Sequence, residues 1–284
     1  MHELFRDSTH IRKQVDRIPP NQGAESPPMI VLEILETTVW KARMERPFSR
    51  QEIVAIIKGT LLALQDIHAQ GLVYGDLKME NIMLNGFDAD EVSDGGGFVV
   101  KLGDLGTVMP PASGICQPVV YRAPEVFFKQ EITPAADLWA LGLIYTHLLE
   151  AQSNFGKTGL YDELLASSDD ASKLEEKVRS ALANDYDLQH HPYYKDAALP
   201  QRDDSHPKGS HWAALRSRGL EELDVAFLQQ VMKADPTTRP SARMILRSQW
   251  IEGGLLARQF KPMGSEESED VTFLCQGPLT PKPA

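Results

Sequence analysis

The sequence predicts an α+β fold in which short strands come first and helices follow. Three observations lead to this class. Short apolar runs bounded by Pro and Gly stand near the N-terminus, which is typical of strands. A long stretch with apolar residues at helical spacing follows at residues 49–71. With 284 residues, of which 42% are apolar, the chain is long enough to bury a sizeable core.

The first two strands are predicted at residues 11–18 and 29–35, separated by the turn-rich sequence NQGAESPP. The helix at residues 49–71 begins with Ser49 and Glu52, which fit a capping box, and Gly71 is a suitable stop. The apolar positions that define its buried face are Ile53, Ile56, Ile57, Leu61, Leu64 and Ile67.

Residues 81–84 and 98–102 predict a hairpin joined by the acidic, Gly-rich sequence NGFDADEVSDGGG. This connection does not match the calcium-loop pattern D-x-[DN]-x-[DN]-G, so we interpret it as a solvated turn. Residues 137–149 predict a buried helix because the run is almost wholly apolar. More exposed helices are predicted at residues 163–182, 222–233 and 241–250.

The composition excludes several classes of protein. The chain has 29 Lys and Arg against 40 Asp and Glu, and its net charge of −11 argues against a general binder of nucleic acid or anionic membranes. Two cysteines, Cys116 and Cys275, cannot build a disulfide framework. No apolar run approaches the roughly 20 residues that cross a bilayer, and the charged N-terminus is unlike a signal peptide. We therefore expect an intracellular protein, cytoplasmic or nuclear, without a nucleic-acid or membrane partner.

The residues that point to chemistry lie between the predicted long helix and the hairpin, in the sequence VYGDLKMENIML. They are Asp76, Lys78 and Asn81, and after the predicted strand FVVKL comes Asp104 in the sequence GDLG. Phosphoryl transfer needs a carboxylate facing the attacking hydroxyl, a cation near the transferred group and oxygen ligands for Mg²⁺. These four side chains supply those groups.

Three further motifs accompany these residues. They are YRAPE at residues 121–125, DLWALG at residues 137–142, and DPTTRPSA, which contains Arg239. Together with YGDLKMEN and DLG they follow the order and spacing of the eukaryotic protein kinase patterns H-R-D-L-x-x-x-N, D-F-G, A-P-E and D-x-W-x-x-G. The chain resembles that family over residues 11–250. In finer detail it looks most like fungal kinases related to SR-protein kinases.

The resemblance implies roles for the four chemical groups. Asp76 would be the catalytic base that orients the substrate hydroxyl. Lys78 would stabilise the γ-phosphoryl group, and its position is that of Ser/Thr kinases. Asn81 and Asp104 would hold Mg²⁺.

The resemblance also implies a nucleotide-binding frame. The backbone of a hinge would meet the adenine of ATP, and this hinge would consist of Glu33, Ile34 and Leu35. Met83 would form the floor under the base, and Asp137 would brace the catalytic loop. Glu125 would form a buried ion pair with Arg239.

Three parts of the chain are predicted from the same resemblance. Residues 1–36 would be a remnant of the kinase N-lobe, with strands 4 and 5 and the hinge. Residues 37–260 would form a largely helical C-lobe, and residues 261–284 an acidic, Pro-rich, disordered tail. The chain departs from the family in having no G-x-G-x-x-G loop and no lysine in a V-A-I-K context before the hinge, and Gly75 replaces the arginine of H-R-D.

Three functions stay open because of these departures. The first, which the complete set of four site residues favours, is a Ser/Thr protein kinase or a fragment of one, using ATP and Mg²⁺ on a protein substrate. The second is a pseudokinase that acts as a binding or regulatory module. The third is a small-molecule phosphotransferase, whose loop reads H-G-D, similar to Tyr74, Gly75 and Asp76. Neither the substrate nor the oligomeric state follows from the sequence.

Overall fold

The structure is a computed structural model that describes residues 1–19, 29–156, 159–166, 170–203, 205–207, 209–248 and 250–251. Short strands and helices alternate at first, and helices dominate from residue 134 onward, which confirms the predicted α+β class. The helices are α1 (Val39–Glu45), α2 (Arg50–Ala69), α3 (Pro124–Lys129), α4 (Pro134–Ser153), α5 (Glu163–Ala166), α6 (Ala171–Asp185), α7 (Ser210–Ser217), α8 (Glu222–Val231) and α9 (Ala242–Leu246).

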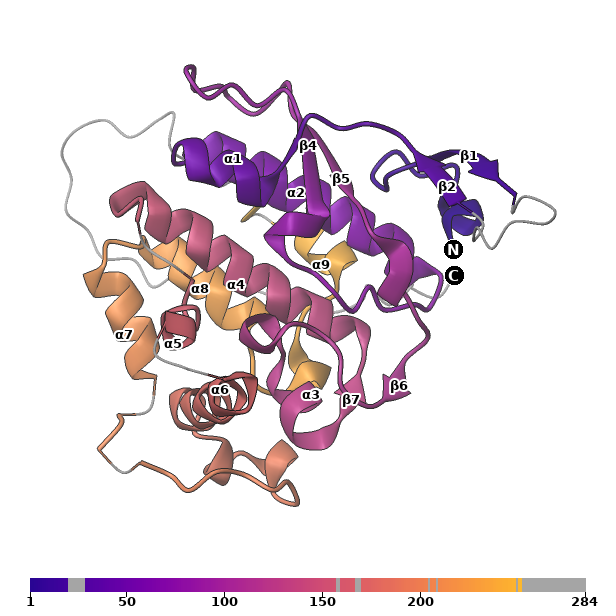
Figure 1. Cartoon of the computed structure of the whole chain (residues 1–284). Helices are drawn as coiled ribbons and strands as arrows, with labels where there is room; N and C mark the ends of the chain where they lie inside the picture. The colour runs from indigo at the N-terminus through magenta and orange to yellow at the C-terminus, as the bar shows by residue number, and fades with distance from the viewer. Residues whose placement is uncertain are drawn as a thin grey trace, which may run out of the picture.

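The strands in the described ranges form small antiparallel sheets. β1 (Gln14–Ile18) pairs with β2 (Met29–Leu32), and this hairpin lies at the edge of the molecule beside the N-terminus (Figure 1). A three-stranded sheet has the order β3 (Thr37–Thr38), β4 (Ile82–Asn85) and β5 (Val99–Leu102). The last pair is β6 (Ala112–Ser113) with β7 (Glu131–Ile132).

Helix α2 connects the three-stranded sheet to the helical part of the molecule. The predicted capping box is confirmed: the Ser49 side chain accepts a hydrogen bond from the Glu52 N–H, and the Glu52 carboxylate accepts one from the Ser49 N–H. The apolar face of α2 packs against α4, α9 and β5 (Figure 1). Gly59 permits the approach to β5, because a Cβ there would lie 2.5 Å from the Cβ of Val100.

Helix α4 lies at the centre of the helical part. It is buried along almost its whole length, and Trp139, Tyr145 and Ile144 are fully enclosed. A helix that is buried on all sides shows no amphipathic period. This is why an apolar run, rather than a 3.6-residue pattern, predicted it at residues 137–149.

Several predicted boundaries are wrong. The single helix expected at residues 163–182 is two helices, α5 and α6, because the Asp170 side chain caps a new N-terminus by accepting a hydrogen bond from the Lys173 N–H. The second strand ends at Leu32 rather than at residue 35. The sequence reasoning missed α1, which Thr38 caps, and also α3 and α7. The tail predicted at residues 261–284 lies outside the described residues.

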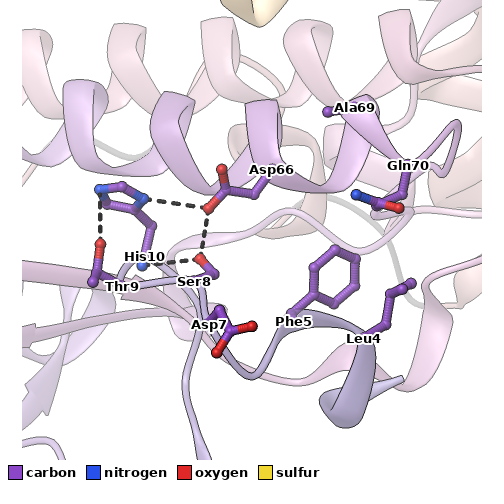
Figure 2. Close-up of a pocket in the computed structure, with 9 residues that line it drawn as sticks. All are labelled: Leu4, Phe5, Asp7, Ser8, Thr9, His10, Asp66, Ala69 and Gln70. Atoms are coloured by element: carbon purple, nitrogen blue, oxygen red, sulfur yellow. Dashed lines mark hydrogen bonds and ion pairs between the residues drawn. The ribbon is translucent and has the colours of Figure 1, made fainter.

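The N-terminal segment is fastened to the C-terminal end of α2 by a small polar network (Figure 2). The Ser8 hydroxyl donates to Asp66 Oδ2 at 2.5 Å, and His10 Nδ1 lies 3.3 Å from the same oxygen. Phe5 is 5% exposed and packs beside this network. Phe5 and the residues of the network line a pocket of about 370 Å³. The network therefore fixes the position of the residues that lead into β1.

Replacing Asp66 with alanine is expected to lower the free energy of unfolding by about 1–3 kcal/mol, because Ser8 and His10 lose their shared charged acceptor. Urea denaturation measures the difference. Gln70→Ala is the matched control, since Gln70 lines the same pocket and its side chain has no hydrogen-bond partner among the described residues. Equal stability of the two variants would show that the network does not hold the segment.

Candidate active site

A carboxylate, an ammonium group and an amide meet in the loop that joins α2 to β4. Lys78 Nζ lies 2.8 Å from Asp76 Oδ2. Asn81 Nδ2 donates to the same oxygen and to the Asp76 main-chain carbonyl, both at 2.9 Å. Met79, which is fully buried, anchors the 3₁₀ turn between them. The structure thus brings together the three residues predicted to be catalytic.

The buried carboxylate of Asp137, at the start of α4, holds the main chain of this loop in place. Its two oxygens accept the main-chain N–H groups of Tyr74 at 2.8 Å and Gly75 at 2.9 Å. His68 Nε2 lies 2.9 Å from Asp137 Oδ2, so the last turn of α2 contributes a third partner. Asp137 is therefore a positioning residue, as the resemblance implied, and His68 is a partner that the sequence reasoning missed.

Asp104 follows β5 and lies beside the same loop. The Gly103 N–H donates to the Asn81 carbonyl at 2.9 Å, and the Tyr74 hydroxyl donates to the Gly103 carbonyl at 2.6 Å. These two bonds tie both main-chain groups of Gly103 to the loop that joins α2 to β4. Asp104 itself has left-handed backbone geometry with φ 44°, and its side chain accepts the Gly106 N–H. Its carboxylate is exposed where a ligand can reach it.

The pKa of Tyr74 reflects its burial and the negative charge around this site. The pKa of Tyr74 is raised well above its ordinary value, first by burial and then by the carboxylates of Asp76, Asp104 and Asp137. The phenol therefore stays protonated and remains a hydrogen-bond donor. The three carboxylates give the site a local excess of negative charge, which a bound cation would offset.

The donor set fits Mg²⁺. Asn81 makes its two hydrogen bonds to Asp76 through Nδ2, which leaves its amide oxygen available, and Asp104 offers an exposed carboxylate. Mg²⁺ commonly takes one or two protein oxygens and completes its octahedron with phosphate oxygens and water. No group of three or more His, Cys, Asp or Glu side chains within the described ranges could hold a metal by itself.

The predicted hinge runs from the end of β2 toward β3. Burial alone would raise the pKa of Glu33, but hydrogen bonds from the Lys101 side chain and the Lys13 N–H lower it. Lys101 Nζ lies 2.7 Å and 2.8 Å from the two Glu33 carboxylate oxygens, which ties the hinge to β5. Ile34 is 89% exposed, and Leu35 is buried.

Met83, on β4, lies against the residue that precedes Asp104. A Cβ at Gly103 would stand 3.1 Å from the Met83 sulfur. Glycine at this position therefore lets the Met83 side chain and the β5–Asp104 connection lie in contact. Lys101, the ion-pair partner of the hinge, is the cross-strand neighbour of Met83.

The segment from Asp104 to Glu125 is held by hydrogen bonds around Gln117. This residue has φ 68°, its Nε2 donates to the Ala136 carbonyl at 2.9 Å, and its Oε1 accepts the Ala123 N–H at 3.0 Å. Arg122 Nε adds a bond to the Cys116 carbonyl. The sequence reasoning missed Gln117, since nothing in its local pattern distinguishes it from a surface glutamine.

The predicted buried ion pair of Glu125 and Arg239 lies at the end of this segment. Arg239 Nη1 and Nη2 each lie 2.7 Å from one carboxylate oxygen of Glu125, and neither side chain is exposed. The Arg239 guanidinium also stacks over the Trp139 ring, 5.0 Å from its centroid. This arrangement confirms the pairing that the resemblance implied.

A helical α+β fold whose loop before β4 holds Asp, Lys and Asn beside a DLG aspartate has the pattern of the protein kinase class. The family model described as "protein kinase domain" matches residues 21–251, which is most of the chain. The chain therefore belongs to the protein kinase family, and the predicted kinase fold is confirmed.

Curated relatives agree with this family. Serine/threonine-protein kinase 33 of Bos taurus is 27% identical over 239 residues, which cover 80% of this chain and 41% of the relative. Cyclin-dependent kinase F-3 of Oryza sativa subsp. japonica is 27% identical, with 79% of this chain and 48% of the relative covered. Mitogen-activated protein kinase HOG1 of Wallemia muriae is 30% identical over 126 residues, covering 44% of this chain and 43% of the relative.

The chain spans less than half the length of each of these three relatives. None of the three is an SR-protein kinase, and that narrower resemblance stays a prediction. In the part of the chain that the structure describes, no helix has both the length and the apolar character needed to cross a membrane.

Proposed function

We propose that this chain is the catalytic part of a Ser/Thr protein kinase, which transfers the γ-phosphoryl group of ATP to a hydroxyl group of a protein substrate inside the cell. The observation that carries the proposal is the geometry around Asp76. Lys78 and Asn81 both bond to Oδ2, and Oδ1 has no hydrogen-bond partner among the described residues. One carboxylate oxygen is thus left to accept the proton of a substrate hydroxyl.

Each residue of the loop has a part in this chemistry. The hydroxyl oxygen of the substrate attacks the γ-phosphorus, its proton passes to Asp76, and ADP leaves. Lys78 stands beside the attacking group and offsets the negative charge that develops on the transferred oxygens. Mg²⁺ held by Asn81 and Asp104 would neutralise the phosphate charge.

A pseudokinase is the second candidate. The observation that favours it lies within the loop, where Gly75 replaces the arginine of the H-R-D pattern. A small-molecule phosphotransferase is disfavoured, since Lys78, YRAPE and DLWALG match the protein kinase pattern.

Nucleotide binding by this chain tests the proposal against the pseudokinase. ATP with Mg²⁺, at about ten times its Kd, is expected to raise the Tm by about 3–6 °C. The shift should be smaller without Mg²⁺, and Asp104→Asn should lose the Mg²⁺-dependent part of it. Asp90→Asn, which changes an exposed carboxylate in the β4–β5 connection, is the matched control and should behave as the wild type.

No change in Tm at millimolar ATP would contradict the proposal and leave the pseudokinase as the better account of this chain. A shift that Asp104→Asn retains in full would separate nucleotide binding from the proposed metal ligands. A shift that depends on both Mg²⁺ and Asp104 supports the assignment and justifies transfer assays with protein substrates.

A further inference from the structure

A second pocket, the α5–α7 pocket, is lined by residues of α5, α6 and α7, at the end of the molecule opposite to the β1–β2 hairpin (Figure 1). Its volume is about 320 Å³, which is at the lower end of the range that is typical of small-molecule sites. The apolar side chains of Leu160, Leu164 and Ala214 form part of its wall. Polar side chains from the end of α6 and the start of α7 form another part.

His211, on α7, is a buried polar side chain in the wall of this pocket. It is 6% exposed, and neither of its ring nitrogens has a hydrogen-bond partner among the described residues. Nδ1 lies 3.6 Å from Asp185 Oδ1, which is too long for a hydrogen bond. The hydroxyl of Tyr186, whose ring centroid lies 4.7 Å from that of His211, also has no partner in the described ranges. Such groups cost free energy unless something in the pocket bonds to them.

The surroundings of His211 keep its ring neutral. Burial lowers the pKa of His211 to about 4, although the nearby Asp185 carboxylate opposes this change. A neutral imidazole has one N–H donor and one acceptor nitrogen. Because the carboxylate can only accept, the hydrogen is expected on Nδ1 beside it, and Nε2 is left as an acceptor. The pocket wall therefore contains an acceptor that needs a donor.

Ser210, the residue before His211, supplies the opposite group. His206 Nε2 lies 2.8 Å from Asp185 Oδ1 and 3.0 Å from Ser210 Oγ. This nitrogen carries its hydrogen toward the carboxylate, so it cannot accept a hydrogen bond from the Ser210 hydroxyl. The hydroxyl hydrogen is therefore left for another acceptor. The same contact excludes a Ser-His-Asp catalytic triad, in which serine and aspartate bond to different nitrogens of the histidine.

The buried charged groups around the pocket are already engaged. Asp185 also accepts a hydrogen bond from the Tyr161 hydroxyl at 3.1 Å, and Arg218 is paired with the buried Glu150. Glu163 is exposed to water. A charged ligand would thus lose hydration without gaining a buried counter-charge, whereas an uncharged ligand has no such cost. The site favours a neutral head group with a donor next to an acceptor, and a carboxamide is the simplest such group.

We propose that the α5–α7 pocket binds a small, uncharged carboxamide with an apolar body. Its amino group donates to His211 Nε2, its carbonyl accepts from the Ser210 hydroxyl, and its body packs against the apolar part of the wall. The inference does not depend on the proposed function, because it assigns a second ligand site in a different part of the molecule from the candidate active site.

Three probes of nearly equal shape test this chemistry. Benzamide is neutral and carries a donor and an acceptor, benzoate is an anion that only accepts, and benzamidinium is a cation that only donates. Titrations of the full chain, followed by ligand-observed NMR, are expected to give a Kd in the millimolar range for benzamide. Benzoate and benzamidinium are each expected to bind about tenfold more weakly, because either one leaves His211 or Ser210 without a partner.

Two variants locate the bound probe. His211→Phe keeps an aromatic ring against Tyr186 and Trp212 but removes both nitrogens, and Ser210→Ala removes the hydroxyl. Each variant is expected to weaken benzamide binding about tenfold. Ser217→Ala is the matched control, because Ser217 is an exposed serine of the same helix outside the pocket wall, and it should bind benzamide as the wild type does.

The possible results either support the inference or overturn it. If no probe binds, water alone fills the pocket and the inference is wrong. Benzamide binding that both variants retain would place the probe elsewhere on the molecule, which also contradicts it. Equal affinities for the three probes would overturn the recognition of a neutral amide. Should His211→Phe fail to fold, Ser210→Ala and its control give the same reading, since Ser210 is only partly buried.

Discussion

The variant Asp76→Asn is expected to lower the rate of phosphoryl transfer about 10²–10⁴-fold and to leave nucleotide affinity almost unchanged. An amide has the size of the carboxylate and can still accept hydrogen bonds from Lys78 and Asn81, so the loop keeps its shape. It cannot accept the hydroxyl proton, because its basicity is negligible. A split between transfer rate and binding is the signature of a base, whereas a structural residue would lower both.

Single-turnover transfer to a protein substrate, measured beside nucleotide titration, checks this split. Asp90→Asn makes the same chemical change on the exposed β4–β5 connection and should keep the wild-type rate. Equal rates for Asp76→Asn and the wild type would remove Asp76 from the role of base. A parallel loss of rate and affinity would instead assign it to holding the loop.

The parts of the fold that the sequence predicted well are those with strong local signals. The Ser49 capping box and the apolar face after it predicted residues 49–71, and α2 spans Arg50–Ala69. The β4–β5 hairpin was predicted because two apolar runs flank a polar, Gly-rich connection. Both signals lie within a few residues of the element they specify.

The predictions that failed needed information from more distant residues. Residues 163–182 continue a helical composition, and only the capping bond of Asp170 to the Lys173 N–H shows that a new helix begins there. Helix α1 has seven residues, too few for a clear period, and it forms because Thr38 caps it and Val39 and Ala42 are buried. A short helix takes most of its stability from such tertiary packing.

The candidate site shows the same contrast between local sequence signals and contacts between distant residues. The motifs predicted Asp76, Lys78, Asn81 and Asp104, since these residues stand in family patterns that can be read along the chain. The contacts of His68 with Asp137 and of Arg12 with Glu33 join residues 69 and 21 positions apart, and no pattern encodes them. These positioning contacts therefore emerged only from the structure, whereas the chemical groups were visible in the sequence.

Breaking the pair of Glu125 and Arg239 is expected to destabilise the fold more than any surface change. Glu125→Gln would leave the Arg239 charge buried without its counter-charge, which typically costs about 3–5 kcal/mol. Arg239→Met should cost at least as much, because Arg239 also donates to the carbonyls of Lys233, Ala135 and Ala234. Those acceptors would lose their partners in the interior.

Urea denaturation of both single variants and of the double variant measures these costs as a double-mutant cycle. The double variant should lose less than the sum of the single losses, since it contains no unpaired charge. The exposed pair of Arg216 and Glu222 has similar distances but lies in water, so Glu222→Gln is the matched control and should cost about 0–1 kcal/mol. Comparable losses at the two sites would show that burial is not what makes the interior pair matter. A larger loss at Glu125 would mean that Arg239 holds the end of the 104–125 segment to the turn before α9. The active-site segment would then depend on a contact with a residue 114 positions away in the chain.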